Sequence, residues 1–175
     1  MLDGIHKIHL IGIGGSGMRA IANILIQKGY DVSGSDIAES AVISKFRDMG
    51  ATVHIGHNKE YVNGVDAIVR STAIREDNPE IVAAKEQGIT ILHRSDIVKA
   101  VLDVTDGIAV AGAHGKTSTT SMIGQILVEA NADPTVIIGG EVDYLKGSSC
   151  LGKGHFRSLI HISEPTRPRL ISYAV

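Results

Sequence analysis

The sequence predicts an α/β fold in two units, and three observations support this prediction. Short apolar runs alternate with helical patterns through the first hundred or so residues, which is typical of a parallel sheet covered by helices. A glycine-rich turn at 12–17 joins the first apolar run directly to a helical pattern. A second glycine-rich turn at 112–118 does the same further along the chain, at the start of the second unit.

The elements of the first unit follow from hydrophobic periodicity and from residues that start or stop helices. Gly29 and Gly50 end the first two helical patterns, and Pro79 opens the third with Asn78 as its cap. The expected strands are 6–11, 31–36, 52–55, 67–70 and 89–92. The first expected helix is marked by 21–28 and ends at Gly29, and the others are 39–49, 79–86 and 97–102. Together they predict a Rossmann-like parallel sheet in residues 1–104.

The second unit is predicted to start after a boundary at 103–106. A strand at 107–111, a helix at 117–130 and a strand at 135–138 follow in that order. Two strands and one helix would leave open sheet edges and an uncovered apolar face. Residues 105–156 are therefore expected to be the incomplete start of a P-loop α/β domain.

Polar residues gather where the predicted strands of the first unit end. In parallel sheets, ligands bind outside these carboxyl ends. In the first turn, Gly12 suits a tight turn, Gly14 a close approach to phosphate and Gly17 close helix packing. Asp36 fits either a ribose-binding carboxylate or the cap of the next helix. The candidate binding residues are Gly14, Gly15, Ser16, Gly17, Asp36, His57, Ser71 and Arg94.

The second turn has the chemistry of a phosphate loop in a shortened form. The strict pattern G-x-x-x-x-G-K-[ST] fails because Val110 stands where its first glycine belongs, which leaves G-x-x-G-K-T. Turn amides bind phosphate oxygens, a lysine adds a point charge, and a threonine hydroxyl ligates Mg²⁺. The candidate residues are Gly112, Ala113, His114, Gly115, Lys116, Thr117 and Ser118, with Lys116 and Thr117 in the catalytic roles and Thr117 as the metal ligand.

Composition narrows the class of protein. The net charge of −2 gives no reason to expect nucleic acid or a membrane surface as partner, and no apolar run has the length of a membrane helix. The single cysteine fits a cytoplasmic protein. None of the eight histidines is paired with another at helical spacing, which disfavours a histidine metal site.

Taken together, the motifs resemble those of the amino-terminal half of the ATP-dependent Mur ligases. The resemblance covers residues from about 5 to 156 and depends on the order and spacing of all the motifs. The motifs are Gly12–Met18, Gly34-Ser35-Asp36, Gly56-His57, Ser71–Ile74 with Asn78-Pro79-Glu80, and Ala111–Thr120.

The resemblance implies a three-domain enzyme that joins L-alanine to the lactyl carboxylate of UDP-N-acetylmuramate through an acyl phosphate. Residues 1–104 would hold the UDP-sugar, with the glycine turn at the diphosphate, Asp36 and His57 near the uridine, and Ser71 and Arg94 near the diphosphate or sugar. The second unit would hold ATP and Mg²⁺, with Lys116 at the β- and γ-phosphates.

Three departures from the family pattern stand out. Ala113 replaces the usual threonine and removes a hydroxyl from the loop, whereas Ser118 keeps the hydroxyl of the threonine it replaces. Residues 157–175 carry one acid, three arginines and two of the four prolines, where the family continues into a strand and an acidic run. We expect this segment to be foreign to the fold and artefactual, resembling translated adapter or vector sequence. We also expect this chain alone to bind the UDP-sugar weakly or not at all and not to ligate.

Other functions fit part of the sequence. A nicotinamide-dinucleotide module of a dehydrogenase or redox sensor would use Gly12–Gly17 and Asp36 but has no need of the second loop. A P-loop switch or ATPase leaves the first hundred residues unexplained. An α/β fragment without activity of its own is the remaining alternative.

Overall fold

The computed structural model describes residues 2–102, 106–145, 147–152, 154 and 156–161. The chain divides into two compact units, Met1–Val104 and Thr105–Val175. Within the described ranges, no helix has the length and apolar character needed to cross a membrane.

The first unit is built on a five-stranded sheet whose strands all run parallel. The strands are β1 (Lys7–Ile11), β2 (Asp31–Asp36), β3 (Thr52–Ile55), β4 (Ala67–Arg70) and β5 (Thr90–His93), in the order β3-β2-β1-β4-β5. This confirms the predicted parallel α/β sheet. Because the strands are parallel, the segments that follow them all leave the sheet at one edge, which we call the carboxyl edge.

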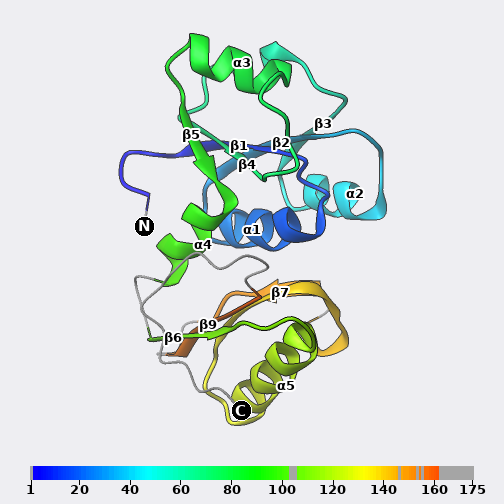
Figure 1. The fold of residues 1–175 in the computed structure, drawn as a ribbon, viewed down its shortest axis with the longest axis vertical. Helices are drawn as coiled ribbons and strands as arrows, with labels where there is room; N and C mark the ends of the chain where they lie inside the picture. The colour runs from blue at the N-terminus through cyan, green and yellow to red at the C-terminus, as the bar shows by residue number, and fades with distance from the viewer. Residues whose placement is uncertain (1, 103–105, 146, 153, 155, 162–175) are drawn as a thin grey trace. The chain divides into compact units, whose positions relative to one another are not determined.

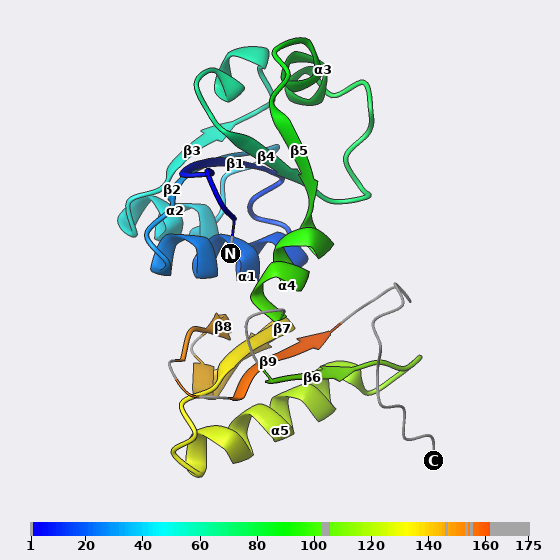
Figure 2. The ribbon, with the colours of Figure 1, turned by 90° about the vertical axis from the view of Figure 1, so that its left-hand side faces the viewer.

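Helices cover both faces of this sheet (Figures 1 and 2). The helices α1 (Ser16–Gln27), α2 (Ala41–Asp48) and α4 (Arg94–Leu102) lie on one face, and α3 (Pro79–Glu86) with the short 3₁₀ helix η1 (Lys59–Val62) lies on the other. Leu10, Ile21 and Phe46 belong to the core on the first side, whereas Ile11 and Ile81 belong to the core on the second. Strand β1 is thus buried on both faces, as central parallel strands are.

The ends of the elements differ slightly from the prediction. Helix α4 begins at Arg94, three residues before the predicted start, because hydrogen bonds to His93 stabilise a helical first turn there. The Asp96 carboxylate accepts from the His93 amide at 2.8 Å, and the Ser95 hydroxyl contacts the His93 ring at 2.7 Å. Helix η1 was not predicted from the sequence.

The second unit has a four-stranded sheet with helix α5 (Lys116–Glu129) packed on it (Figure 2). Its elements are β6 (Asp106–Val110), β7 (Thr135–Val142), the 3₁₀ helix η2 (Asp143–Leu145), β8 (Gly147–Cys150) and β9 (Phe156–His161). The sheet order is β6-β9-β7-β8, with β8 antiparallel to β7. Val136 and Ile138 form a small core against Ile123 and Leu127 of the helix.

This sheet corrects two expectations. Two strands are expected here from the sequence, and the structure has four. Residues 157–175 are expected from the sequence to be foreign to the fold, but 157–161 belong to β9, which pairs in parallel with both β6 and β7. The short apolar pair Leu159-Ile160 lies in register with Ile108 and Ala109, so a backbone ladder forms where the sequence carries no clear alternation. The rest of that segment, 162–175, lies outside the described residues.

Candidate functional site

The glycine turn after β1 is held closed by its own backbone. The amides of Gly12 and Ile13 both donate to the Ser35 carbonyl, at 2.8 and 3.0 Å, and the Gly15 amide donates to the Gly12 carbonyl at 3.0 Å. Gly12 has a φ of +73°, which a residue with a side chain rarely adopts. The turn therefore passes from β1 into α1 at the carboxyl edge of the sheet.

Helix α1 begins without a side-chain cap. Its N-cap is Gly15, and its first turn contains no acidic residue. Ser16, the first residue of the helix, is exposed. Amides of the first turn have no partner within a helix, and the helix dipole adds partial positive charge at this end. This end of α1 is thus suited to bind an anion such as a phosphate.

The side chain of Arg94 reaches this same helix end. A Cβ atom placed on Gly17 would lie 1.9 Å from Arg94 Nη1, so the guanidinium occupies the space beside the first turn of α1. Only glycine at position 17 leaves that space open. The structure therefore brings together two residues predicted from the sequence as binding residues, and it adds a full positive charge to the anion site.

Asp36 organises the glycine turn from the end of β2. Its Oδ2 accepts from the Gly14 amide at 2.8 Å, and its Oδ1 accepts from the amide of Ile37 at 2.8 Å. A Cβ on Gly14 would come within 2.9 Å of Asp36 Oδ2. The alternative in which Asp36 caps the next helix is wrong, because the Ser40 hydroxyl caps α2 by accepting from the Ile43 amide.

His57 belongs to a polar cluster that was not predicted from the sequence. Its Nδ1 lies 3.1 Å from Glu80 Oε1 and 3.2 Å from Ser35 Oγ. Glu80 Oε2 in turn accepts from the Ser35 hydroxyl at 2.8 Å and lies 3.3 Å from His9 Nε2. Glu80 and His9 are fully buried. An acid in the first turn of α3, on a face otherwise made of Ile81, Ala83 and Ala84, was the available signal.

Burial raises the pKa of the Glu80 carboxyl, but hydrogen bonds from His9, Ser35 and His57 outweigh it and hold the pKa below its ordinary value. The carboxylate is therefore ionised at neutral pH.

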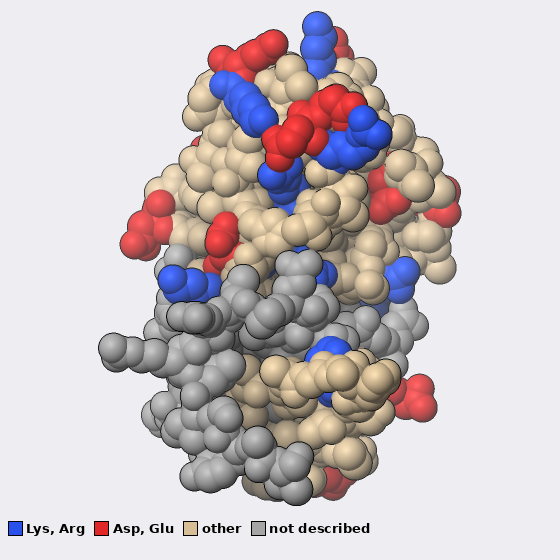
Figure 3. Space-filling view, in the orientation of Figure 1, with Lys and Arg blue, Asp and Glu red and all other residues tan. Residues whose placement is uncertain are grey.

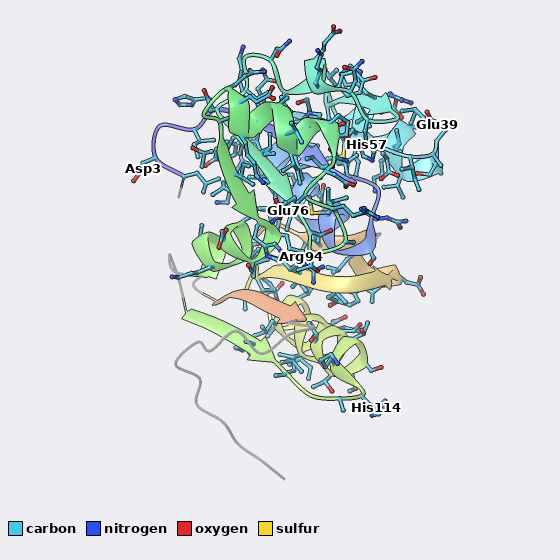
Figure 4. The ribbon with its side chains drawn as sticks, turned by 45° about the horizontal axis from the view of Figure 1, so that its top comes forward. Asp3, Glu39, His57, Glu76, Arg94 and His114 are labelled. Carbon is cyan, nitrogen blue, oxygen red and sulfur yellow. The ribbon has the colours of Figure 1, made fainter. Side chains whose placement is uncertain are left out.

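Ser71 follows β4 in a turn, where its carbonyl accepts from the Ile74 amide at 3.2 Å. The predicted binding residues thus follow the strands along one edge, in the order His57, Asp36, glycine turn, Ser71 and Arg94. Figure 4 labels His57 and Arg94, the two ends of this row.

On the face of the first unit seen in Figure 3, acidic and basic side chains are interspersed. Glu76, for example, pairs with Arg70 and with Lys85.

The second glycine turn also leads into a helix without a side-chain cap. Gly115, the N-cap of α5, has a φ of +73°, and the first turn of α5 contains no acidic residue. The Lys116 ammonium donates to the carbonyls of Gly112 and Ala113 within the loop. His114, labelled in Figure 4, is exposed with the rest of the loop. This loop combines amides at a helix end with a lysine, as phosphate binding requires.

A metal ion at this loop would depend on few protein ligands. Among the described residues, no group of three or more His, Cys, Asp or Glu side chains could hold a metal ion. Mg²⁺ commonly takes one or two protein ligands and completes its shell with phosphate oxygens and water. The Thr117 hydroxyl in the first turn of α5 fits that arrangement.

A parallel sheet whose glycine turn leads into an uncapped helix, followed by a second unit with a lysine in the turn before its helix, is the architecture of nucleotide-binding α/β proteins. Residues 7–104, more than half of the chain, match the model of the Mur ligase family, catalytic domain. The chain belongs to this family.

Several similar proteins carry the name UDP-N-acetylmuramate–L-alanine ligase. The one from Solidesulfovibrio magneticus is 46% identical over 156 residues, which is 89% of this chain and 34% of that protein. The one from Chlorobaculum tepidum is 48% identical over 149 residues, or 85% of this chain and 31% of that protein. This chain spans about a third of the length of the curated relatives it matches.

Solved structures show the same similarity. The crystal structure of UDP-N-acetylmuramate–alanine ligase from Thermotoga maritima has a TM-score of 0.81 at 34% identity, over 87% of this chain and 36% of that one. The Neisseria meningitides ligase for UDP-N-acetylmuramate and L-alanyl-γ-D-glutamyl-meso-diaminopimelate has a TM-score of 0.82 at 25% identity, over 89% of this chain and 52% of that one.

Proposed function

We propose that this chain carries the UDP-N-acetylmuramate site and the ATP loop of an enzyme that joins L-alanine to that UDP-sugar in peptidoglycan precursor synthesis. The observation that carries the proposal is the uncapped start of α1 with Arg94 beside Gly17, at the carboxyl edge of a parallel sheet. The names of the relatives supply the substrates.

The diphosphate of the UDP-sugar would bind at the glycine turn. Gly14 and Gly15 would shape the turn around the diphosphate, Ser16 and Gly17 would offer backbone amides at the positive end of α1, and Arg94 would neutralise part of the diphosphate charge. Asp36 and His57 lie farther along the edge and would contact the uridine. Ser71 would contact the diphosphate or the sugar.

ATP would bind at the loop that precedes α5. The amides of 112–118 would hold phosphate oxygens, Lys116 would contact the β- and γ-phosphates, and Thr117 would ligate Mg²⁺. The lactyl carboxylate attacks the γ-phosphorus, which gives an acyl phosphate and ADP. The amine of L-alanine then displaces phosphate and forms the amide. Lys116 supports the first step by neutralising charge on the transferred phosphoryl group.

Since the chain spans only about a third of its relatives, we propose that it binds the UDP-sugar weakly and does not ligate alone. The first unit has a five-stranded sheet and two apolar cores, which supports binding by this unit.

Calorimetric titration of the 175-residue chain tests the proposed site. We expect saturable binding of UDP-N-acetylmuramate in the micromolar to millimolar range, with a Kd that rises as salt is added because the diphosphate contacts are electrostatic. We expect no saturable binding of NADH. Saturable NADH binding without a response to the UDP-sugar would instead identify a nicotinamide-dinucleotide module and contradict the proposal.

A further inference from the structure

Glu80 lies beneath the carboxyl edge and receives hydrogen bonds from two sides. On one side, Oε2 faces the Ser35 hydroxyl at 2.8 Å and His9 Nε2 at 3.3 Å. On the other, Oε1 faces His57 Nδ1 at 3.1 Å and the Asn58 amide at 3.3 Å. The Glu80 side chain has no exposed surface. Four groups able to donate thus converge on one buried carboxylate.

This arrangement decides which ring nitrogen of His57 carries hydrogen. An ionised carboxylate only accepts hydrogen bonds, so His57 Nδ1 must be protonated to face Glu80. In the neutral ring, Nε2 is then without hydrogen and accepts. The low pKa of Glu80 described above supports the ionised state of the carboxylate.

The other nitrogen of the His57 ring is available to a ligand. Within the part of the chain that the structure describes, Nε2 has no hydrogen-bond partner, and 20% of the side chain is exposed. His57 follows β3, and the neighbouring Gly56 amide donates to the Asp36 carbonyl at 2.8 Å, so both residues lie at the same stretch of the carboxyl edge.

We propose that Glu80 is a positioning residue: it holds His57 with Nδ1 turned inward, so that Nε2 is presented as a hydrogen-bond acceptor to the nucleoside of the bound nucleotide. The proposal rests on the proposed function for the identity of that ligand. The group that Nε2 receives is a donor, either the ring N–H of uracil or a ribose hydroxyl. Glu80 itself is too deeply buried to contact the ligand.

Glutamine at position 80 is the conservative replacement. Its single carbonyl oxygen can accept from His57 and Asn58, while its amide group faces Ser35 and His9. The Ser35 hydroxyl can turn and accept, and His9 can accept at Nε2 when its ring hydrogen is on Nδ1, toward Ser33 Oγ. Glu80→Gln therefore preserves the His57 tautomer, and Glu80→Leu removes the acceptor altogether. Glu86→Gln, an exposed position at the end of the same helix, is the matched control.

The first test is ¹⁵N NMR of the histidine rings in the full 175-residue chain, at a pH where His57 is neutral. We expect unaltered protein, Glu80→Gln and Glu86→Gln to show His57 with hydrogen on Nδ1 and a bare Nε2. We expect Glu80→Leu to lose this pattern. A His57 ring with hydrogen on Nε2 in the unaltered chain would overturn the proposal, and this result does not depend on whether the leucine variant folds.

The second test measures the affinities of the same proteins for UDP and CDP. We expect Glu80→Leu to weaken UDP binding about tenfold, the loss of one hydrogen bond, with Glu80→Gln close to unaltered protein. If Glu80→Leu loses affinity for UDP but not for CDP, the donor is the ring N–H of uracil. If it loses affinity for both equally, the donor is a ribose hydroxyl. Equal UDP affinity in a folded Glu80→Leu variant would overturn the positioning role. Failure of the unaltered chain to bind UDP would overturn the proposed function, while the NMR test would still decide the tautomer.

Discussion

Replacing Glu80 with leucine is expected to lower the free energy of unfolding by about 3 kcal/mol at neutral pH. Leucine is apolar and somewhat larger than glutamate, and it leaves the buried donors of His9 and Ser35 without their acceptor. Each such group costs about 1–3 kcal/mol when it is buried without a partner. Urea denaturation followed by circular dichroism measures the difference, with the exposed Glu86→Leu as a control expected to stay within about 0.5 kcal/mol.

The free energies of unfolding of unaltered protein and Glu80→Leu should differ less at acid pH than at neutral pH. The folded-state pKa of Glu80 is below its ordinary value of 4.5. The stability that its ionisation provides is therefore complete above about pH 4.5 and is lost as the pH falls through the lower folded-state pKa. The gap between unaltered protein and Glu80→Leu should shrink from neutral pH to about pH 3. A gap that stays constant, or an absent gap at neutral pH, would show that the carboxylate contributes no such stability.

Replacing Gly17 with alanine is expected to weaken binding of the UDP-sugar about 10- to 100-fold without unfolding the protein. The new Cβ would overlap Arg94 Nη1, so we expect the guanidinium to move away from the start of α1. Alanine also favours a helix by about 1 kcal/mol over glycine, so the stability of the protein should be unchanged or higher. The loss of affinity would therefore not result from misfolding.

A double-mutant cycle decides whether Arg94 is the cause. If Gly17→Ala acts by displacing the guanidinium, then Arg94→Ala should weaken binding by a similar factor, and the double variant should be no worse than Arg94→Ala alone. The measurement is the Kd of UDP-N-acetylmuramate for all four proteins. Fully additive losses would mean that alanine 17 blocks the ligand directly and that Arg94 acts independently.

The strands and the two glycine turns were predictable because their signals are local. Largely apolar runs such as Ile8–Ile11, interrupted only by His9, and Ala67–Val69 lie between turn residues, and glycines mark the passages from strand to helix. Once a parallel sheet was inferred, the alignment of Asp36, His57 and Arg94 along one edge followed from topology alone.

The cluster of Glu80 with His9, Ser35 and His57 was not predictable in the same way, because residues far apart in the sequence meet there only in the folded protein. Residue 80 meets residues 9, 35 and 57 after the crossover that places α3 on the sheet. In the sequence, an acid just after Asn78-Pro79 indicates only the favourable charge at a helix start. Strands β8 and β9 were missed because neither segment alternates apolar and polar residues.

Phosphate release by a hybrid enzyme tests the central claim most directly. In the hybrid, residues 1–156 replace the matching segment of the Solidesulfovibrio magneticus relative, which is 46% identical over 156 residues. We predict release that requires ATP, L-alanine and UDP-N-acetylmuramate together, and a kcat about 100- to 1,000-fold lower after Lys116→Met. A folded hybrid that binds the UDP-sugar but releases no phosphate, or one that Lys116→Met leaves unchanged, would contradict the account.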